Sequence, residues 1–193
     1  MEWKLFDGDV PYVSTAEFHA DRERAPHVEQ PVHRARMDLA LDCVRAAAHW
    51  YGEPTLSDLG AGDGGFLSLV RPYVGNAWGY DFCPANLAGA VERGTDVRDA
   101  NFTTDPVEFG TIVTMTEVLE HMADPHGMLR RLWTSGVRVV VASSPYVETN
   151  LSHDACHAWA WDEEGYRNLF EQSGWSVARH ETVPYFQVIL ARR

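Results

Sequence analysis

The run Asp58-Leu59-Gly60-Ala61-Gly62-Asp63-Gly64-Gly65-Phe66 is the stretch that decides the fold. It follows an apolar segment predicted to be a strand over 55–59 and precedes a predicted helix from 64 to 70. The spacing Gly60-x-Gly62-x-x-Gly65 is typical of a tight strand-to-helix turn whose backbone approaches a ligand closely. In a doubly wound sheet such turns line the crevice beyond the carboxyl ends of the strands. The run therefore predicts an α/β fold with a ligand site at this turn.

Working outward from the loop, short apolar strands alternate with helices to the end of the chain. This alternation predicts a doubly wound, mostly parallel sheet with helices on both faces. Val137–Ala142 is a continuous apolar run, as expected for a strand buried on both faces. The predicted strands are 55–59, 77–80, a short one at Val97, 110–115, 137–142, and a closing hairpin of 175–183 and 185–191. The predicted helices begin near residues 64, 84 and 125, and an amphipathic segment covers 161–174.

The chain reads as one domain over residues 1–193, with an N-terminal annex over 1–51 and an α/β core over 52–193. Residues 1–33 are predicted to be largely irregular, apart from a helix opening at Ser14-Thr15-Ala16-Glu17 in which a hydroxyl caps the first turn. A longer helix is predicted from about 35 to 50 by the apolar spacing of Met37, Leu41, Val44 and Ala48.

The segment before that longer helix has two interpretations. It forms a lid that excludes water from the ligand, or it is a surface annex with solvated histidines. The residues in question are His27, Gln30 and His33, together with Tyr12 and Phe18.

Composition limits the kinds of partner. The 193 residues include 16 Lys plus Arg and 28 Asp plus Glu, which gives a formal charge of −12. Such a surface repels phosphate backbones and argues against nucleic acid as a partner. Cys43, Cys83 and Cys156 are far apart and resemble neither a disulfide framework nor a CxxC metal site. With no apolar run long enough to span a bilayer and no signal pattern at the N-terminus, we expect a cytoplasmic protein.

The acids of the glycine loop indicate which ligand it binds. Asp58 precedes the first glycine by two residues, and Asp63 lies at the start of the following helix. Two carboxylates oppose the pyrophosphate that a dinucleotide would place there. They suit a ligand that carries an ammonium and a sulfonium and has no phosphate, such as S-adenosylmethionine (SAM).

Two further acids close the next strands. A carboxylate at Asp81 is placed to accept both hydroxyls of a ribose, the role described for acids at this position in dinucleotide folds. Asp99 closes the third strand, where it can accept from an adenine amino group. Three acids at successive strand ends predict the footprint of an adenosine-containing cofactor.

These motifs resemble the class I SAM-dependent methyltransferases from about Leu56 to the C-terminus. The resemblance rests on the D-L-G-x-G-x-G loop, Asp81, Asp99-Ala100 and the segment Thr116-Glu117-Val118-Leu119-Glu120-His121. It implies a seven-stranded sheet with an antiparallel last strand. It also implies SAM contacts by Asp58, Gly60, Ala61, Gly62, Asp81, Phe82, Asp99, Ala100 and Thr116.

The Glu-x-x-Glu-His segment has three interpretations. Positions i, i+3 and i+4 share one face of a helical turn, so Glu117, Glu120 and His121 are candidate ligands for Mg²⁺, Mn²⁺, Zn²⁺ or Fe²⁺. A further ligand would come from His157 or His153. Alternatively, His121 is a general base assisted by Glu117, or the segment is purely structural.

Three functions remain open at this level. The first is an O-methyltransferase for a small molecule, because deprotonating a hydroxyl needs a base or a metal. The segment is similar to that of ubiquinone-pathway O-methyltransferases. It is also similar to the segment of small-RNA 3′-terminal 2′-O-methyltransferases, which bind a metal through such a run. The second possible function is therefore a metal-dependent RNA-end methyltransferase. The third is a SAM-binding regulatory module without catalysis.

Overall fold

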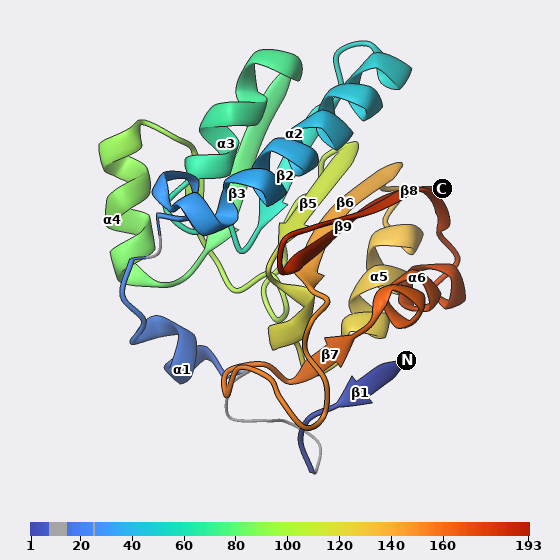
Figure 1. Ribbon diagram of the computed structural model, residues 1–193. Coiled ribbons are helices and arrows are strands. Elements are labelled where there is room, and N and C mark those ends of the chain that lie inside the picture. The colour runs from blue at the N-terminus through green and yellow to red at the C-terminus, as the bar shows by residue number, and fades with distance from the viewer. Residues whose placement is uncertain (8–14, 25) are drawn as a thin grey trace.

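The computed structural model describes residues 1–7, 15–24 and 26–193 (Figure 1). Ser14 and Tyr12, named in the predictions above, lie outside this part of the chain. A seven-stranded sheet in the order β4-β3-β2-β5-β6-β9-β8 forms the centre. The first five strands of this order are parallel, and β9 runs antiparallel to both β6 and β8. The predicted fold class is therefore confirmed, including the antiparallel closing strand.

The strand bounds agree with the sequence pattern to within a few residues. The strands of the sheet are β2 (Thr55–Leu59), β3 (Asn76–Asp81), β4 (Val97–Asp99), β5 (Ile112–Thr116), β6 (Val139–Pro145), β8 (Ser176–Val183) and β9 (Phe186–Arg192). Because successive side chains of a strand point to opposite faces, the central strands fill two cores. Ile112 packs on one face, whereas Val113 and Met115 pack on the other.

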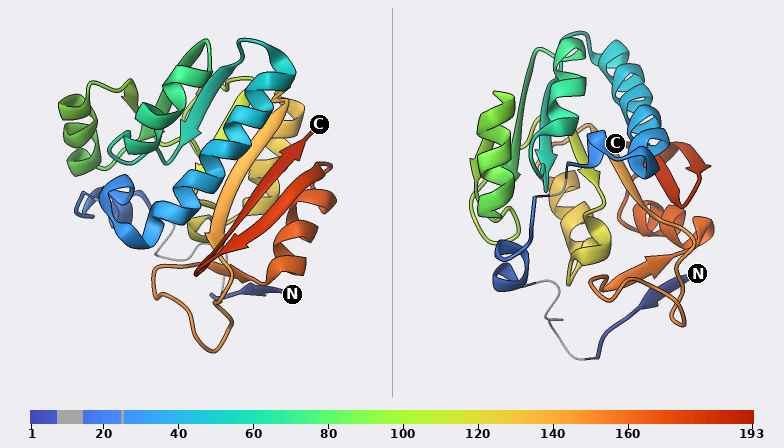
Figure 2. Two further views of the ribbon diagram at one scale, coloured as in Figure 1. Left: turned by 45° about the horizontal axis from the view of Figure 1, so that its top comes forward. Right: turned by 60° about the vertical axis from the view of Figure 1, so that its left-hand side comes forward.

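Helices cover both faces of the sheet (Figures 1 and 2). Helices α2 (Pro31–Tyr51) and α3 (Gly65–Val70) pack against the core that includes Ile112, and α4 (Pro84–Arg93) lies beside α3. On the other face, α5 (Pro125–Thr134) packs against α6 (Glu163–Gln172). Short 3₁₀ turns are η2 (His27–Glu29), η3 (Arg71–Tyr73) and η4 (Leu119–His121).

The N-terminal annex differs from its prediction in two ways. The long helix begins at Pro31, four residues earlier than expected, because proline is well tolerated in the first turn. The very start of the chain is not irregular: β1 (Glu2–Lys4) pairs antiparallel with β7 (Trp159–Trp161). Trp161 is therefore a strand residue, and the helix expected over 161–174 begins at Glu163. The short helix α1 (Ala16–Ala20) begins within the predicted segment, and its cap is Thr15, whose side chain accepts from the amide of Phe18.

The order of the strands locates the site. From β2 the chain proceeds outward to β3 and β4, then crosses back to β5 on the other side of β2. The reversal leaves a crevice at the carboxyl ends of β2 and β5, the usual ligand position in open α/β sheets. Among the described residues, no helix is long and apolar enough to cross a membrane.

Candidate active site

The glycine loop is shaped by positive backbone angles that other residues rarely adopt. Gly60 has φ of 70° and Gly62 has φ of 56°. A Cβ atom on Gly60 would lie 2.7 Å from Val118 Cγ2, so this position also needs the missing side chain. The amide of Gly62 donates to Asp81 Oδ2 at 2.8 Å, which ties the loop to the end of β3.

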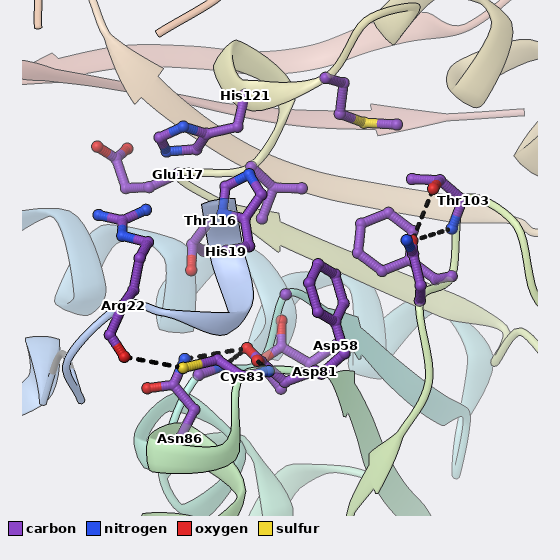
Figure 3. A pocket seen from close by; sticks show the side chains of 18 of the residues that line it. His19, Arg22, Asp58, Asp81, Cys83, Asn86, Thr103, Thr116, Glu117 and His121 are labelled. Atoms are coloured by element: carbon purple, nitrogen blue, oxygen red, sulfur yellow. Dashed lines mark hydrogen bonds between the residues drawn. The ribbon is translucent and has the colours of Figure 1, made fainter. Parts of the chain in front are cut away.

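A cavity of about 560 Å³ opens at this loop, a volume suited to a ligand of cofactor size. Figure 3 shows Asp58 and Asp81 on one side of it, with His19, Glu117 and His121 on the other. Of the predicted cofactor-binding residues, seven line this cavity: Asp58, Gly60, Ala61, Gly62, Asp81, Phe82 and Thr116. The cavity therefore has one side formed by the loop and its acids, and another formed by the segment after β5.

The two predicted acids of the first side have different environments. Asp58 is 2% exposed and accepts a hydrogen bond from Thr114 Oγ1 at 2.6 Å. Burial raises its pKa to about 7, although the hydrogen bond from Thr114 opposes the shift. Asp81 is half-buried and accepts from the amide of Cys83 at 2.8 Å and from Asn86 Nδ2 at 3.3 Å. A cationic ligand beside Asp58 would favour its ionised form.

The environment of Asp63 differs from the one expected from the sequence. It was expected to face the ligand as a negative charge, but it is neutralised by Arg24 at 3.0 Å and Arg93 at 2.8 Å. Its other oxygen accepts from the amide of Gly65. Burial disfavours the ionised form, but the bonds from Arg93 and Arg24 outweigh it and lower the pKa of Asp63. The case against a pyrophosphate at this loop therefore rests on Asp58.

The end of β4 also differs from its prediction. Asp99 and Ala100 are not among the described residues that line the cavity, and Asp99 is exposed. The next three residues, Asn101, Phe102 and Thr103, form that part of the wall instead. The chain therefore reaches the cavity only after β4 has ended, beyond Asp99 and Ala100.

The annex forms part of the cavity wall. His27 lies at the cavity as expected of a lid residue, whereas Gln30, His33 and Phe18 do not line it. Sequence reasoning missed the other annex residues that do so, which are His19, Arg22, Glu23, Val28 and Met37. Arg22 and Glu23 lie outside the helices, and His19 and Val28 lie in the short elements α1 and η2, so none of these four has a periodic signal. Met37 belongs to the predicted apolar spacing of α2, but that spacing does not indicate a position at the cavity.

Arg36 is a buried cation that sequence reasoning also missed. It is fully buried on α2, donates to Ser143 Oγ at 3.2 Å, and lies 3.9 Å from Glu117 Oε1. Desolvation, followed by the nearby Arg36 charge, lowers the pKa of His27 to about 3 and that of His33 to about 4. A charged residue of an amphipathic helix is expected on the solvent face, so the sequence pattern did not predict that Arg36 points inward.

The two glutamates of the Glu-x-x-Glu-His segment occupy separate environments. Glu117 lines the cavity and accepts from Ser143 Oγ at 3.0 Å. Glu120 is fully buried, and neither of its carboxylate oxygens has a hydrogen-bond partner within the described part of the chain. Burial raises the pKa of Glu117, and burial together with the Glu117 charge raises that of Glu120 well above its ordinary value.

His121 lines the cavity on the same side as Glu117. Its Nδ1 lies 2.9 Å from the carbonyl oxygen of Cys156, so the neutral ring donates from Nδ1 and carries its lone pair on Nε2. Burial, followed by the neighbouring His157, lowers the pKa of His121 to about 3. The imidazole is therefore neutral across the physiological pH range.

The predicted metal ligands do not come together as a set of four. Over residues 1–7, 15–24 and 26–193, a single group of three or more His, Cys, Asp or Glu residues has its ligand atoms within 4.8 Å of one another. It consists of His121, Cys156 and His157, and it includes neither Glu117 nor Glu120. Glu117 is engaged with Arg36 and Ser143 instead.

Comparisons with known proteins agree on the kind of domain. A family model described as "Methyltransferase domain" matches residues 32–187. No curated protein matches the chain. The fold is similar to magnesium protoporphyrin IX methyltransferase from Synechocystis PCC 6803 with bound SAH, with a TM-score of 0.67, 16% identity and 84% of each chain covered.

Two more solved structures share the fold. One is an S-adenosylmethionine dependent methyltransferase from Mesorhizobium loti, with a TM-score of 0.66, 14% identity, and coverage of 86% of this chain and 100% of that one. The other belongs to a complex between the Haloferax volcanii Trm112 methyltransferase activator and a putative methyltransferase. Its TM-score is 0.65 at 17% identity, with 89% of this chain and 98% of that chain covered.

Proposed function

This chain belongs to the class I SAM-dependent methyltransferase family, and from that premise we propose that it methylates an oxygen of a small-molecule acceptor. The observation that carries the proposal is the neutral imidazole of His121 across the cavity from the glycine loop. A nitrogen acceptor arrives with its own lone pair, whereas a hydroxyl must lose a proton. A proton acceptor opposite the cofactor loop therefore favours oxygen.

The first side of the cavity fits the cofactor. When bound, SAM supplies an electrophilic methyl carbon on a positively charged sulfur. Asp58 would offset the positive charge of the methionine portion, and Asp81 would accept from the ribose hydroxyls. Gly60, Ala61 and Gly62 let the backbone approach, and Phe82 and Thr116 complete the wall. Alignment of the reacting groups alone contributes about 7–11 kcal/mol against a bimolecular reference.

The second side would activate the acceptor. His121 Nε2 accepts a hydrogen bond from the acceptor hydroxyl, and Glu117 helps to orient it. A base with a pKa of about 3 does not deprotonate an alcohol in the ground state. It takes the proton as the oxygen forms its bond to carbon, because the oxygen then becomes strongly acidic.

An acceptor panel tests this function. The panel holds aromatic compounds matched in size that present a hydroxyl, an amine or a thiol, and SAM carries an isotopic label in its methyl group. We expect label in the hydroxyl compounds and a turnover that falls roughly 10²–10⁴-fold in His121→Gln. SAM affinity should stay unchanged in that variant.

His49→Gln, an exposed change in the last turn of α2, is the matched control and should keep full turnover. Label confined to amines, or equal turnover in His121→Gln and wild type, would contradict the proposal.

A further inference from the structure

Two segments far apart in the sequence meet behind the acceptor side of the cavity. Cys156 and His157 precede β7, and His121 ends the turn η4. One ring nitrogen of each histidine and the Cys156 sulfur lie within 4.8 Å of one another, and the ring centres of the two histidines are 4.8 Å apart. The amide of Ala158 donates to the carbonyl of Glu120 at 2.6 Å, which fastens the two segments together.

Both histidines are held by acceptors at the same ring position. His121 Nδ1 bonds the carbonyl of Cys156 at 2.9 Å, and His157 Nδ1 bonds Glu148 Oε2 at 2.6 Å. Metal-binding histidines usually donate one N–H to a carbonyl or carboxylate in this way, since the bond fixes the tautomer and orients the ring. In their neutral forms both rings then carry the lone pair on Nε2.

The buried carboxylate of Glu120 is an independent sign that a cation belongs here. It lies in the same turn as His121, and within the described residues its oxygens have no hydrogen-bond partner. Buried acids are normally paired or near a metal, and a bound cation would compensate both the carboxylate and the thiolate.

We propose that His121, Cys156 and His157 bind one Zn²⁺ ion. Two imidazoles and a thiolate are ligands that zinc prefers, whereas Mg²⁺ and Mn²⁺ prefer oxygen. This set replaces the Glu-rich one expected from sequence. Three protein ligands leave a fourth position, which is the arrangement of catalytic rather than structural zinc.

Because His121 lines the cavity, we place the fourth position on its acceptor side. This part of the inference rests on the proposed function. A hydroxyl bound to zinc has a lowered pKa and releases its proton to water. With zinc bound, His121 would hold the metal, and water instead of His121 would take the proton. The new oxygen–carbon bond would form as the bond between the methyl carbon and the SAM sulfur breaks, and the sulfur would leave with that electron pair as neutral S-adenosylhomocysteine.

Cobalt titration of the protein without a histidine tag tests the site. Co²⁺ replaces Zn²⁺ and gives a thiolate-to-cobalt charge-transfer absorption when a cysteine is a ligand. We expect this band to saturate at one equivalent and to disappear when Zn²⁺ is added. It should be absent in Cys156→Ser. Co²⁺ affinity should fall roughly 10–100-fold in Glu148→Gln, which weakens the hold on His157 and on the amide of Asp154 but removes no ligand.

Cys43→Ala and His153→Ala are the matched controls. Cys43 is buried on α2, and His153 is exposed on the loop that carries Cys156. Both variants should keep the band. Absence of the band in the wild type, its persistence in Cys156→Ser, or its loss in His153→Ala would overturn the proposal.

Azide tests the open position, because it coordinates a vacant site on Co²⁺ and shifts the visible absorption bands. If azide leaves the absorption bands unchanged, the proposed open coordination position is contradicted. The metal measurements do not depend on SAM, and we expect the cobalt band to be unchanged in Asp81→Ala. Cobalt binding with no methyl transfer to any hydroxyl would support the metal site and contradict the proposed function.

Discussion

Asp58 carries the clearest consequence at the scale of single residues. It is fully buried in the cofactor-free protein, and burial raises its pKa to about 7. A carboxyl group with a raised folded-state pKa contributes stability below its unfolded-state pKa of about 3.9. That contribution is lost as pH rises through 7, because the ionised form is poorly accommodated. A buried carboxylate retained at this cost is best explained by a cationic ligand.

The first prediction concerns the variant Asp58→Asn. Without cofactor it should be more stable than the wild type, and its advantage should grow by about 1 kcal/mol for each pH unit between 5 and 7. Urea unfolding of both proteins at pH 5, 7 and 8 measures this difference. SAM affinity should fall in the variant. An advantage of the same size at all three pH values would contradict the assignment.

The second prediction concerns Gly60→Ala. The new Cβ would meet Val118 Cγ2 at 2.7 Å, and the backbone angle adds about 1–2 kcal/mol of strain. We expect lower stability and weaker SAM binding, both measured by thermal unfolding with and without SAM.

Gly94→Ala separates the two causes. Gly94 also has a positive φ, of 67°, but a Cβ atom added to it would have no other atom within 4 Å. This variant should show the backbone strain alone and normal SAM binding. The double variant Gly60→Ala with Val118→Ala should recover part of the loss; equal effects of Gly94→Ala and Gly60→Ala would argue against the contact with Val118.

At the scale of elements, the annex is fastened to the cofactor loop by charge. Arg24 bridges Asp63 of the loop and Glu92 of α4, and Arg93 bridges Asp63 and Glu29 of the turn η2. These contacts hold together the annex, the loop and α4 over one end of the cavity. They fit a lid that must open for the cofactor to enter.

The third prediction follows for Arg24→Gln. Amide exchange over residues 15–24 and 27–29 should become faster, and SAM should dissociate several-fold faster, because the annex closes less often. Hydrogen exchange and stopped-flow displacement measure these two effects. Glu92→Gln is the control, since that side chain is 69% exposed and its pair with Arg24 is weak. Unchanged SAM dissociation in Arg24→Gln would show that the annex is not a lid.

Elements with a regular pattern could be predicted from the sequence, and those formed by distant pairing could not. Thr55–Leu59 and the closing hairpin follow from apolar runs and alternation. The pair β1 and β7 joins two three-residue strands from opposite ends of the chain, so neither has a local signal. The same holds for the site: Asp58 and Asp81 end predicted strands, whereas Cys156 reaches His121 through a loop whose path no pattern specifies.

At the scale of the whole molecule, charge separates the remaining functions. The formal charge is −12, and Arg24 and Arg93, which contact the glycine loop, are paired with acids. A surface with this balance offers little attraction for a phosphate backbone.

The fourth prediction is that RNA does not bind. Fluorescence anisotropy with a short labelled single strand at low salt should show no binding up to micromolar protein, with or without Zn²⁺. Low salt favours binding, so it is the most demanding condition. Saturable binding that prefers a free 3′ end would instead support the RNA-end methyltransferase.

The central claim is that the cavity at the carboxyl ends of β2 and β3 binds SAM through the acids that end those strands. Calorimetric titration of SAM into the wild type and into Asp81→Ala tests it most directly. We predict one site in the wild type and an affinity at least about tenfold lower in the variant, a loss of roughly 1.4 kcal/mol. Equal affinity in the two proteins, or no binding to the wild type, would contradict the claim.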